Sequence, residues 1–259
     1  MVEELLLVRK LRRIYLIDNS PVRWDEWQSP SDKVTYIWNK GENPGYGRAH
    51  NIAIRKSVYN HTELHLVMNS DILVKAADID YLHELMLHNP QIGSLMPHVV
   101  YPDGETQYLC KLLPTPFGLF GRRFLPERWT RRRNERYTLR RNAKGEWVPD
   151  SYARMLNVPY LSGCFMLLRT EAVLQARLFD ERYFMYPEDV DLTRTIHRNW
   201  LTVYCPDVTI VHNHAAASYH SPRMLWIHIV NMCRYFNKWG WLIDKERRLM
   251  NRLTLEQLT

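Results

Sequence analysis

The sequence predicts an α/β fold with a mostly parallel central sheet flanked by helices. Short apolar, β-branched runs alternate with helical patterns, and polar loops join them. Several of these loops follow the end of a predicted strand, the edge at which open α/β sheets bind ligands. With 259 residues, 46% of them hydrophobic and 24% charged, the chain is long enough for one large domain of this class or two small ones.

The first half of the chain supplies the repeated strand–loop–helix unit. Strands are predicted at 14–17, 34–38, 64–68 and 92–96. Helices are predicted at 2–13, 49–59 and 78–88. Because helices separate most of these strands, the strands are expected to run parallel.

Polar residues follow three of these strands. Asp18 and Asn19 begin the loop after the first strand, where a plain Asx turn is an alternative explanation. The second strand leads through a loop with Gly45 to a helix N-terminus, which is a ready site for an anion, although many such loops contain glycines. Asp71 adds a carboxylate just past the third strand. These positions indicate a ligand site at one edge of the sheet.

Between Arg122 and Arg141 the composition changes to nine arginines and two glutamates, interleaved with aromatic residues. This stretch belongs to a predicted surface excursion over 117–150. It is either a solvated loop or a patch that faces phosphates on a substrate or a membrane surface. The net charge of +7 fits anionic partners. Because no recognised nucleic-acid-binding module accompanies the basic stretch, a nucleic-acid partner is not predicted.

The second half continues the α/β pattern. A strand is predicted over 159–169, where the small residues Ser162, Gly163 and Cys164 allow close approach of a ligand or a neighbouring backbone. Further strands are predicted at 201–204 and 208–211, and helices at 170–176, 187–199 and 222–243. The last helix mixes tryptophans with basic residues, so it either packs on the domain or lies in a membrane interface.

Three carboxylates, Glu188, Asp189 and Asp191, follow Pro187 at the start of the helix predicted over 187–199. Proline favours the first turn of a helix, and acidic side chains suit a helix N-terminus. The carboxylates are therefore either a helix cap or a candidate general base at the edge of a pocket. Two histidines, at 212 and 214, follow a strand end and are candidate ligands.

The cysteines and the apolar runs indicate where the protein resides. Four cysteines are scattered without C-x-x-C spacing, which is typical of reduced cysteines in a cytosolic protein. No signal peptide and no apolar run long enough to span a membrane are present. A cytoplasmic location is therefore expected.

Six short motifs follow one another along the chain. They are Asp18-Asn19-Ser20, Asn43-x-Gly45-x-Gly47-x-x-x-Asn51, Asn69-x-Asp71, Ser162-Gly163-Cys164, Glu188-Asp189-Val190-Asp191-Leu192 and His212. In this order and spacing they resemble family 2 glycosyltransferases of the GT-A fold, and more narrowly the rhamnosyltransferase-like branch. The runs 103–107 (DGETQ) and 114–116 (PTP) also look like that branch. The resemblance places a GT-A domain over 1–218 and a C-terminal helical extension over 219–259.

The resemblance implies a role for each motif. The implied donor-binding residues are Asp18, Asn19, Gly45, Arg48, Asn51, Asn69, Asp71 and Gly163. Residues 69–71 stand where such enzymes carry a D-x-D-type metal motif, although position 69 is Asn. Asp71 and His212, with His214 as the rival ligand, would hold Mn²⁺ or Mg²⁺. Asp189 would be the catalytic base, with Glu188 and Asp191 as neighbouring acidic residues of the catalytic motif.

The implied activity is an inverting transfer of a sugar, of the rhamnose type, from dTDP-rhamnose or a UDP-sugar to a glycan or lipid-linked glycan acceptor. The implied pathway is synthesis of a cell-surface polysaccharide of the O-antigen or capsule type. Enzymes of this kind often act at the cytoplasmic face of the inner membrane. We therefore expect peripheral membrane contact through the basic stretch and the helix over 222–243.

The chain departs from the family pattern at its start. Family members begin with a strand of the type V-x-V-V-I-x-T-Y-N, and this chain starts at the helix that follows it. Either the true start lies upstream, or the protein works with an incomplete sheet, or it is a damaged copy. The alternative function is a non-catalytic GT-A-fold binding protein that has lost turnover with its first strand. A basic nucleic-acid binder is a third hypothesis.

Overall fold

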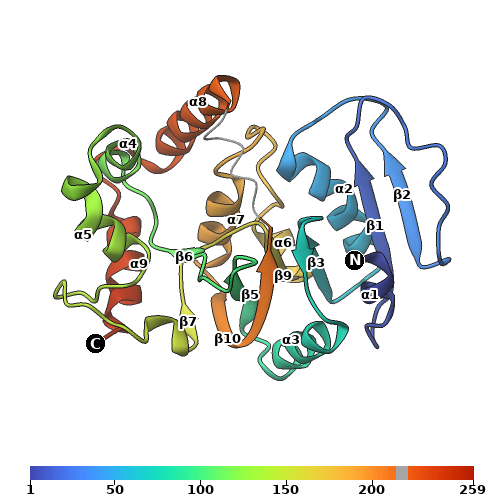
Figure 1. The fold of residues 1–259 in the computed structure, drawn as a ribbon, viewed down its shortest axis with the longest axis horizontal. Coiled ribbons are helices and arrows are strands. Elements are labelled where there is room, and N and C mark those ends of the chain that lie inside the picture. Colours follow the sequence, from blue (N-terminus) through green and yellow to red (C-terminus); the bar gives the residue numbers. More distant parts are fainter. Residues whose placement is uncertain (214–220) are drawn as a thin grey trace.

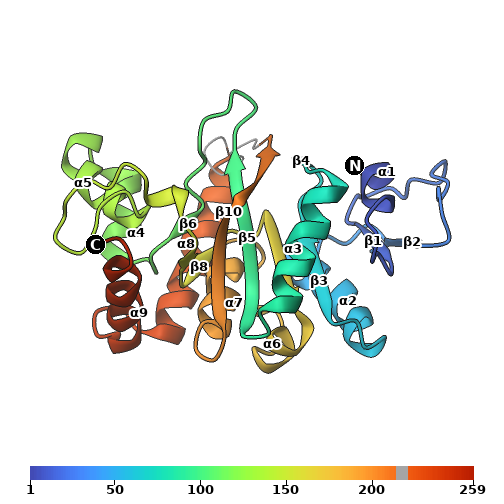
Figure 2. The same ribbon diagram turned by 90° about the horizontal axis from the view of Figure 1, so that it is seen from below.

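The structure, a computed structural model, describes residues 1–213 and 221–259, apart from the side chains of residues 120, 122–124 and 127. A mixed sheet with helices on both faces forms the centre of the molecule (Figure 1). In both views the strands β1 (Ile14–Asp18) and β2 (Val34–Trp38) lie at one end of the molecule. The helices α4 (Pro116–Phe124) and α5 (Glu127–Tyr137) lie at the opposite end (Figure 2).

The central sheet has six strands. Its strands follow the order β3 (Leu64–Met68), β9 (Phe165–Arg169), β5 (Ile92–Val100), β10 (Leu201–His212) and β4 (Ile72–Leu73), with β7 (Leu156–Asn157) also on β10. Only the pairing of β5 with β10 is parallel, so the expectation of a mostly parallel sheet was wrong. The reason is β9, which pairs antiparallel with both β3 and β5. The strands β3, β5 and β10 do share one direction, as the helices between them require, but β9 separates two of them.

The strands β1 and β2 form a separate parallel sheet, with Ile14 opposite Val34. Both were predicted from their apolar runs, and the bounds of β2 were predicted correctly. Neither strand pairs with the six-stranded sheet within the described residues. The two-stranded and six-stranded sheets are therefore separate.

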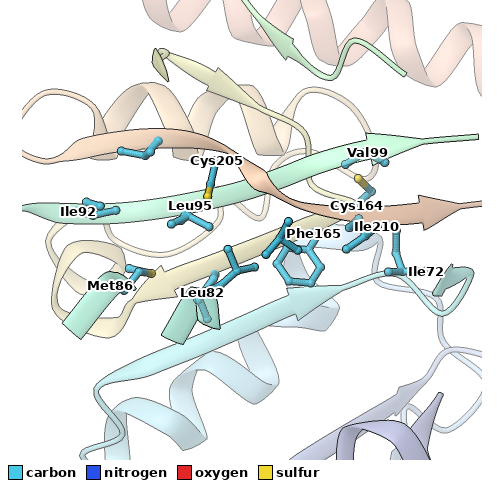
Figure 3. Close-up of a cluster of buried hydrophobic side chains, with 13 residues drawn as sticks. Ile72, Leu82, Met86, Ile92, Leu95, Val99, Cys164, Phe165, Cys205 and Ile210 are labelled. Carbon is cyan, nitrogen blue, oxygen red and sulfur yellow. The ribbon is translucent and has the colours of Figure 1, made fainter. Parts of the chain in front are cut away.

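Two apolar clusters cover the faces of the central sheet. One cluster packs β5, β9 and β10 against α3 (Ala76–His88), with Leu82, Met86 and Phe165 at its centre (Figure 3). The other packs β3 and β9 against α2 (Tyr46–Tyr59), α6 (Thr170–Gln175) and α7 (Glu188–Ile196). Burial on both faces explains why the strands read as continuous apolar runs.

The first helix, α1 (Val2–Leu6), is shorter than the predicted 2–13. Val8 packs on α3, and the backbone N–H and Nε of Arg9 both donate to the carboxylate of Asp80, each at 3.0 Å. The backbone N–H of Arg9 is therefore used by a tertiary contact that competes with helix continuation.

The basic excursion predicted over 117–150 is helical up to Tyr137, where it forms α4 and α5, and non-helical from 138 to 150. Thr115 caps α4 by accepting a hydrogen bond from the backbone N–H of Gly118 at 3.0 Å, and Pro116 occupies the first helical position. A two-stranded sheet of β6 (Cys110–Lys111) and β8 (Tyr160–Leu161) and a short 3-10 helix, η1 (Ser151–Ala153), connect the pair to the core.

The helix predicted over 222–243 ends earlier, at Trp239, and a second helix follows it. Gly240, with a φ of +102°, ends α8 (Pro222–Trp239), and α9 (Lys245–Glu256) was not predicted. Tyr235 and Phe236 of α8 are buried. Arg194 of α7 is 1% exposed and donates to both carboxylate oxygens of Asp244, which caps α9. No helix of the described residues is long and apolar enough to cross a bilayer.

Candidate functional site

A cavity of about 1650 Å³ lies between β1 and β3. Four of the predicted donor-binding residues line it, namely Asp18, Asn19, Asn69 and Asp71. Asp18 ends β1 and Asn19 follows it, and Asn69 and Asp71 follow β3, so the cavity collects the polar residues at these two strand ends. The residues of the predicted ligand site at this edge of the sheet therefore line a cavity, and ligand sites in proteins are usually cavities or clefts.

Asp18 is held as a charged acceptor at this cavity. One carboxylate oxygen accepts from the backbone N–H of Ser20 at 2.8 Å, and the other accepts from the hydroxyl of Tyr36. These hydrogen bonds stabilise the ionised form, so the pKa of Asp18 is lowered. The Asx turn and the ligand role are thus compatible, because the turn orients a carboxylate that still lines the cavity.

Asp71 and His212 face each other across the pairing of β4 with β10. His212 lies opposite Ile72 in that pairing, which sets its Nε2 3.4 Å from Oδ1 of Asp71. Gln107 fixes the ring: its amide nitrogen donates to the carbonyl of His212 at 2.7 Å, and its oxygen lies 2.9 Å from Nδ1. Because that oxygen is an acceptor, Nδ1 carries the proton, and the lone pair of Nε2 points toward Asp71.

A carboxylate oxygen and an imidazole lone pair that face each other suit a divalent cation. Oδ1 of Asp71 is buried and accepts no hydrogen bond from the described residues. Among residues 1–213 and 221–259, no group of three or more potential metal ligands occurs. Two protein ligands fit a cation whose other positions are taken by substrate oxygens and water. His214, the rival ligand, lies outside the described residues.

Asp189 lies at the N-terminus of α7, next to the small residue Gly163. Its carboxylate accepts from the backbone N–H of Gly163 at 2.9 Å and from that of Val190 at 2.8 Å. Burial raises the pKa of Asp189, although these donors and the charge of Lys111 oppose the effect. A carboxylate with a raised pKa and a fixed orientation has the properties of a general base.

Tyr46 connects Asp189 to the cavity. The ring of Tyr46 lines the cavity, and its hydroxyl donates to the carbonyl of Gly163. A Cβ placed on Gly163 would lie 3.3 Å from both Asp189 Cβ and the Tyr46 ring, so only glycine fits without movement. Gly163 therefore links Asp189 to Tyr46, a residue that lines the cavity.

Glu188 is a buried acid beside Asp189. It is 5% exposed, and its Oε2 has no hydrogen-bond partner among the described residues. Burial and, second, the charge of Asp189 raise the pKa of Glu188. Both effects favour the protonated form of Glu188.

Asp191, the third acid of the motif, is hydrogen-bonded to side chains of α8. Its two oxygens accept from Lys238 Nζ and Trp239 Nε1 of α8, each at 2.7 Å, and it is 3% exposed. Asp191 therefore holds α8 against α7, and the structure does not place it at the cavity.

The four other predicted donor residues, Gly163 and the three described next, are not among the residues that line the cavity. The side chain of Asn51 is hydrogen-bonded to the backbone N–H and carbonyl of Phe179 and to Glu181. Arg48 is exposed, with Nε 3.7 Å from the Glu181 carboxylate. Gly45, with a φ of +89°, begins α2, where a Cβ would lie 2.2 Å from a backbone oxygen. These residues fix the loop that leads into the acidic motif.

Tyr46 and Gln107 have no predicted role in the site, although both belong to motifs that carry the resemblance. Tyr46 lies between the glycines of the 43–51 motif, and Gln107 ends the 103–107 run. The signal was their place in those motifs, but their roles come from contacts with residues far along the chain, such as Gly163 and His212.

The chain belongs to the glycosyltransferase-like family 2, whose model matches residues 22–237. It is 32% identical over 158 residues to N-acetylglucosaminyl-diphospho-decaprenol L-rhamnosyltransferase of Mycobacterium tuberculosis, from strains CDC 1551 and H37Rv alike. That match covers 61% of this chain and 49% of the relative, so the chain spans about half the length of these curated relatives.

Two solved structures are similar in fold. A mannosyltransferase from Pyrobaculum calidifontis, solved with GDP-Man and Mn²⁺, has a TM-score of 0.53 and 16% identity, and the match covers 90% of this chain and 59% of that one. A structure of GalNAc-T7 with UDP, GalNAc and Mn²⁺ has a TM-score of 0.54 and 11% identity, covering 82% and 40% respectively. The fold is therefore that of the GT-A glycosyltransferases, as the sequence predicted.

Proposed function

We propose that this protein is an inverting glycosyltransferase that moves a rhamnose-type sugar from dTDP-rhamnose or a UDP-sugar to a glycan or lipid-linked glycan. The observation that carries the proposal is the position of Asp189, which Gly163 holds behind the Tyr46 side of a cavity that Asp18 and Asp71 line. The similarity to a rhamnosyltransferase whose name specifies a lipid-linked substrate supports this donor and acceptor class. The pathway we infer is synthesis of a cell-surface polysaccharide of the O-antigen or capsule type.

In this mechanism Asp189 removes the proton from the acceptor hydroxyl. The hydroxyl oxygen then attacks the anomeric carbon from the face opposite the nucleoside diphosphate. The bond to the diphosphate breaks, the nucleoside diphosphate leaves, and the configuration at the anomeric carbon is inverted. The hydrogen bonds from Gly163 and Val190 orient the carboxylate before the acceptor arrives. Glu188, kept protonated by burial, adds no second negative charge beside the base.

The donor would occupy the polar end of the cavity. Asp18, charged and fixed by Ser20 and Tyr36, faces a space suited to the hydroxyl groups of a nucleoside. The stacked rings of Trp27 and Tyr36, 5.3 Å apart, offer an aromatic surface close to it. Asp71 and His212 would hold Mn²⁺ or Mg²⁺, which would neutralise charge that develops on the leaving diphosphate.

We also infer that the protein acts at the cytoplasmic face of a membrane as a peripheral protein. Arg131, Arg132 and Arg133 of α5 are exposed, and Trp129 on the same helix is 66% exposed. Trp226 of α8 is also 66% exposed. Basic residues favour anionic lipid headgroups and tryptophan favours the interfacial layer, so these residues suit reversible attachment near a lipid-linked acceptor.

A second candidate function is binding without turnover. It is favoured by the separation of β1 and β2, which carry Asp18, from the sheet that carries Asp71 and Asp189. A donor site built across such an interruption is less rigid than one on a single sheet.

The two functions are separated by a panel of dTDP- and UDP-sugars, offered with Mn²⁺ or Mg²⁺ and lipid-linked acceptors. Transfer, or slow hydrolysis of one donor, supports the enzyme. Stabilisation by a nucleotide in a thermal-shift assay without any turnover supports the binding protein, because a ligand of the native state raises apparent stability.

A further inference from the structure

Two aromatic rings hold the guanidinium group of Arg140, which lies in the segment after α5. Its Cζ atom is 4.6 Å from the centre of the Tyr108 ring and 5.8 Å from that of the Trp147 ring. Its Nε donates to the hydroxyl of Thr138 at 3.1 Å. These contacts fix the plane of the guanidinium group, because arginine stacks on aromatic faces and its donors are rigidly arranged.

The two terminal nitrogens of Arg140 have no acceptor among the described residues, and no described carboxylate forms an ion pair with it. The nearby carboxylate of Glu135 is already paired with two other arginines, Arg131 at 3.1 Å and Arg141 at 2.7 Å. A guanidinium group is always charged and offers parallel N–H donors that match the oxygens of a phosphate. Arg140 is therefore a fixed cation whose terminal donors are available to a phosphate.

The rings beside Arg140 are themselves held in place. The Tyr108 ring packs edge-on against the Tyr152 ring, with centres 5.2 Å apart. Tyr108 has a φ of +41°, a backbone conformation that is uncommon for tyrosine and persists only where the surroundings hold it. Trp147 is 50% exposed, so the stack is open to solvent on that side. The cation and its two rings thus form a rigid and accessible surface.

Arg140 lies between two features of the proposed function. On one side it follows α5, the helix proposed to contact a membrane, which ends at Tyr137. On the other side its ring partner Tyr108 directly follows Gln107, whose amide holds His212. Arg140 is not among the residues that line the cavity, so it is separate from the site proposed for the donor.

A lipid-linked acceptor carries its charge in a fixed place, because a phosphate or diphosphate joins the lipid to the sugar. Since the lipid end is proposed to lie near α5 and the sugar hydroxyl at Asp189, the phosphate lies between them. We propose that Arg140, held by Tyr108 and Trp147, binds the phosphate group that joins the acceptor sugar to its lipid. This inference rests on the proposed function and narrows its acceptor to a lipid-linked glycan.

The test is a calorimetric titration of hexyl diphosphate into the whole protein, without nucleotide and with EDTA to remove divalent metal. We expect the wild type to bind the probe and Arg140→Gln to weaken binding by at least about tenfold. Arg140→Lys should lie between the two, because lysine keeps the charge but not the parallel donors. Arg136→Gln removes the same charge from an exposed arginine in the last turn of α5 and should bind like the wild type.

Absence of binding by the wild type would overturn the proposal, as would retained binding by an Arg140→Gln variant whose circular dichroism shows that it folds. Equal losses in Arg140→Gln and Arg136→Gln would also overturn it, because general positive charge would then explain the binding. Nucleoside diphosphate with Mn²⁺ should leave binding of hexyl diphosphate in place, whereas competition would assign the probe to the donor site. The titration needs no transfer, so lack of turnover would count against the proposed function and not against this phosphate site.

Two further measurements separate the possible sources of the phosphate. Inorganic pyrophosphate lacks the alkyl chain and should bind less tightly than hexyl diphosphate, because the exposed Trp147 ring gives that chain an apolar contact. Equal binding of the two would indicate a site for free phosphate. Arg140→Gln should reduce co-sedimentation with phosphatidylglycerol vesicles no more than Arg136→Gln does. A larger loss, with binding of hexyl diphosphate unchanged, would indicate a site for lipid headgroups, and either result would contradict the assignment to the acceptor.

Discussion

The carboxylate of Asp189 accepts a hydrogen bond of 2.9 Å from the backbone N–H of Gly163, a residue whose carbonyl accepts from Tyr46. One peptide segment thus connects the candidate base to a side chain that lines the cavity. The segment β8–β9 and the N-termini of α2 and α7 meet here, so the site depends on contacts between distant parts of the chain.

Gly163→Ala should displace the base. The added Cβ would lie 3.3 Å from both Asp189 and Tyr46, so one of them must move by a few tenths of an ångström. Small misplacements of a catalytic group are costly, and we expect kcat to fall about tenfold, with a smaller loss of donor affinity because Tyr46 lines the cavity. Steady-state kinetics and calorimetry measure the two effects. Gly121→Ala, where the nearest atom is 3.6 Å away, is the control and should behave like the wild type.

Asp71→Ala and His212→Ala should each weaken metal-dependent binding of the nucleoside diphosphate. Gln107→Leu should weaken it by about 10–100-fold, because Gln107 fixes the tautomer and orientation of His212. Titration of Mn²⁺ by calorimetry in the presence of nucleoside diphosphate measures this. Gln91→Leu, at an exposed glutamine, should have no effect. A normal His212→Ala variant together with a defective His214→Ala variant would exchange the two ligands.

Glu188→Gln should stabilise the protein increasingly as the pH rises. In the folded state the pKa of Glu188 is raised above its ordinary value of 4.5, so the folded state binds more protons than the unfolded state above that pH. Wild-type stability contributed by this group therefore falls with rising pH, and glutamine does not titrate. Thermal unfolding of both proteins between pH 5 and 8 should show a growing difference in Tm in favour of the variant. A constant difference would contradict the burial argument.

Replacement of Arg131, Arg132 and Arg133 with serine should reduce binding to anionic vesicles. Each basic residue near an anionic surface contributes about 1 kcal/mol, and high salt should screen it. Co-sedimentation with phosphatidylglycerol vesicles and with neutral vesicles, at low and high salt, measures this. Lys10 and Arg12 precede β1, and Lys33 precedes β2, the two strands at the end of the molecule opposite α5 (Figure 1). Replacing these three residues removes equal charge there and should matter little. Equal binding to both vesicle types would exclude the electrostatic mechanism.

Local patterns predicted the strands well. The apolar runs that became β2 and β3 were assigned with the correct bounds, because each is a short apolar run bounded by polar residues. Sheet order was not predictable in this way. The position of β9 between β3 and β5 depends on pairings such as Leu64 with Arg169, which are far apart in the sequence.

The sequence predicted which residues belong to the candidate site better than it predicted where their side chains lie. Asp18 and Asp71 were found because each follows a strand end, and both line the cavity. Asp191 was grouped with Asp189 because the two are close in sequence, yet a helix turn directs Asp191 toward α8 instead. Its partner Lys238 is 47 residues away in the sequence, and local sequence patterns do not predict contacts at such a separation.

Transfer by an Asp189→Asn variant tests the proposed mechanism most directly. Asparagine keeps the shape of the side chain but cannot take a proton, so transfer should fall by about 10²–10⁴-fold. Nucleotide and metal binding, measured by calorimetry on the same preparation, should remain close to the wild type. Near-normal transfer by Asp189→Asn, with loss of transfer in Glu188→Gln or Asp191→Asn, would contradict the assignment of Asp189 as the base.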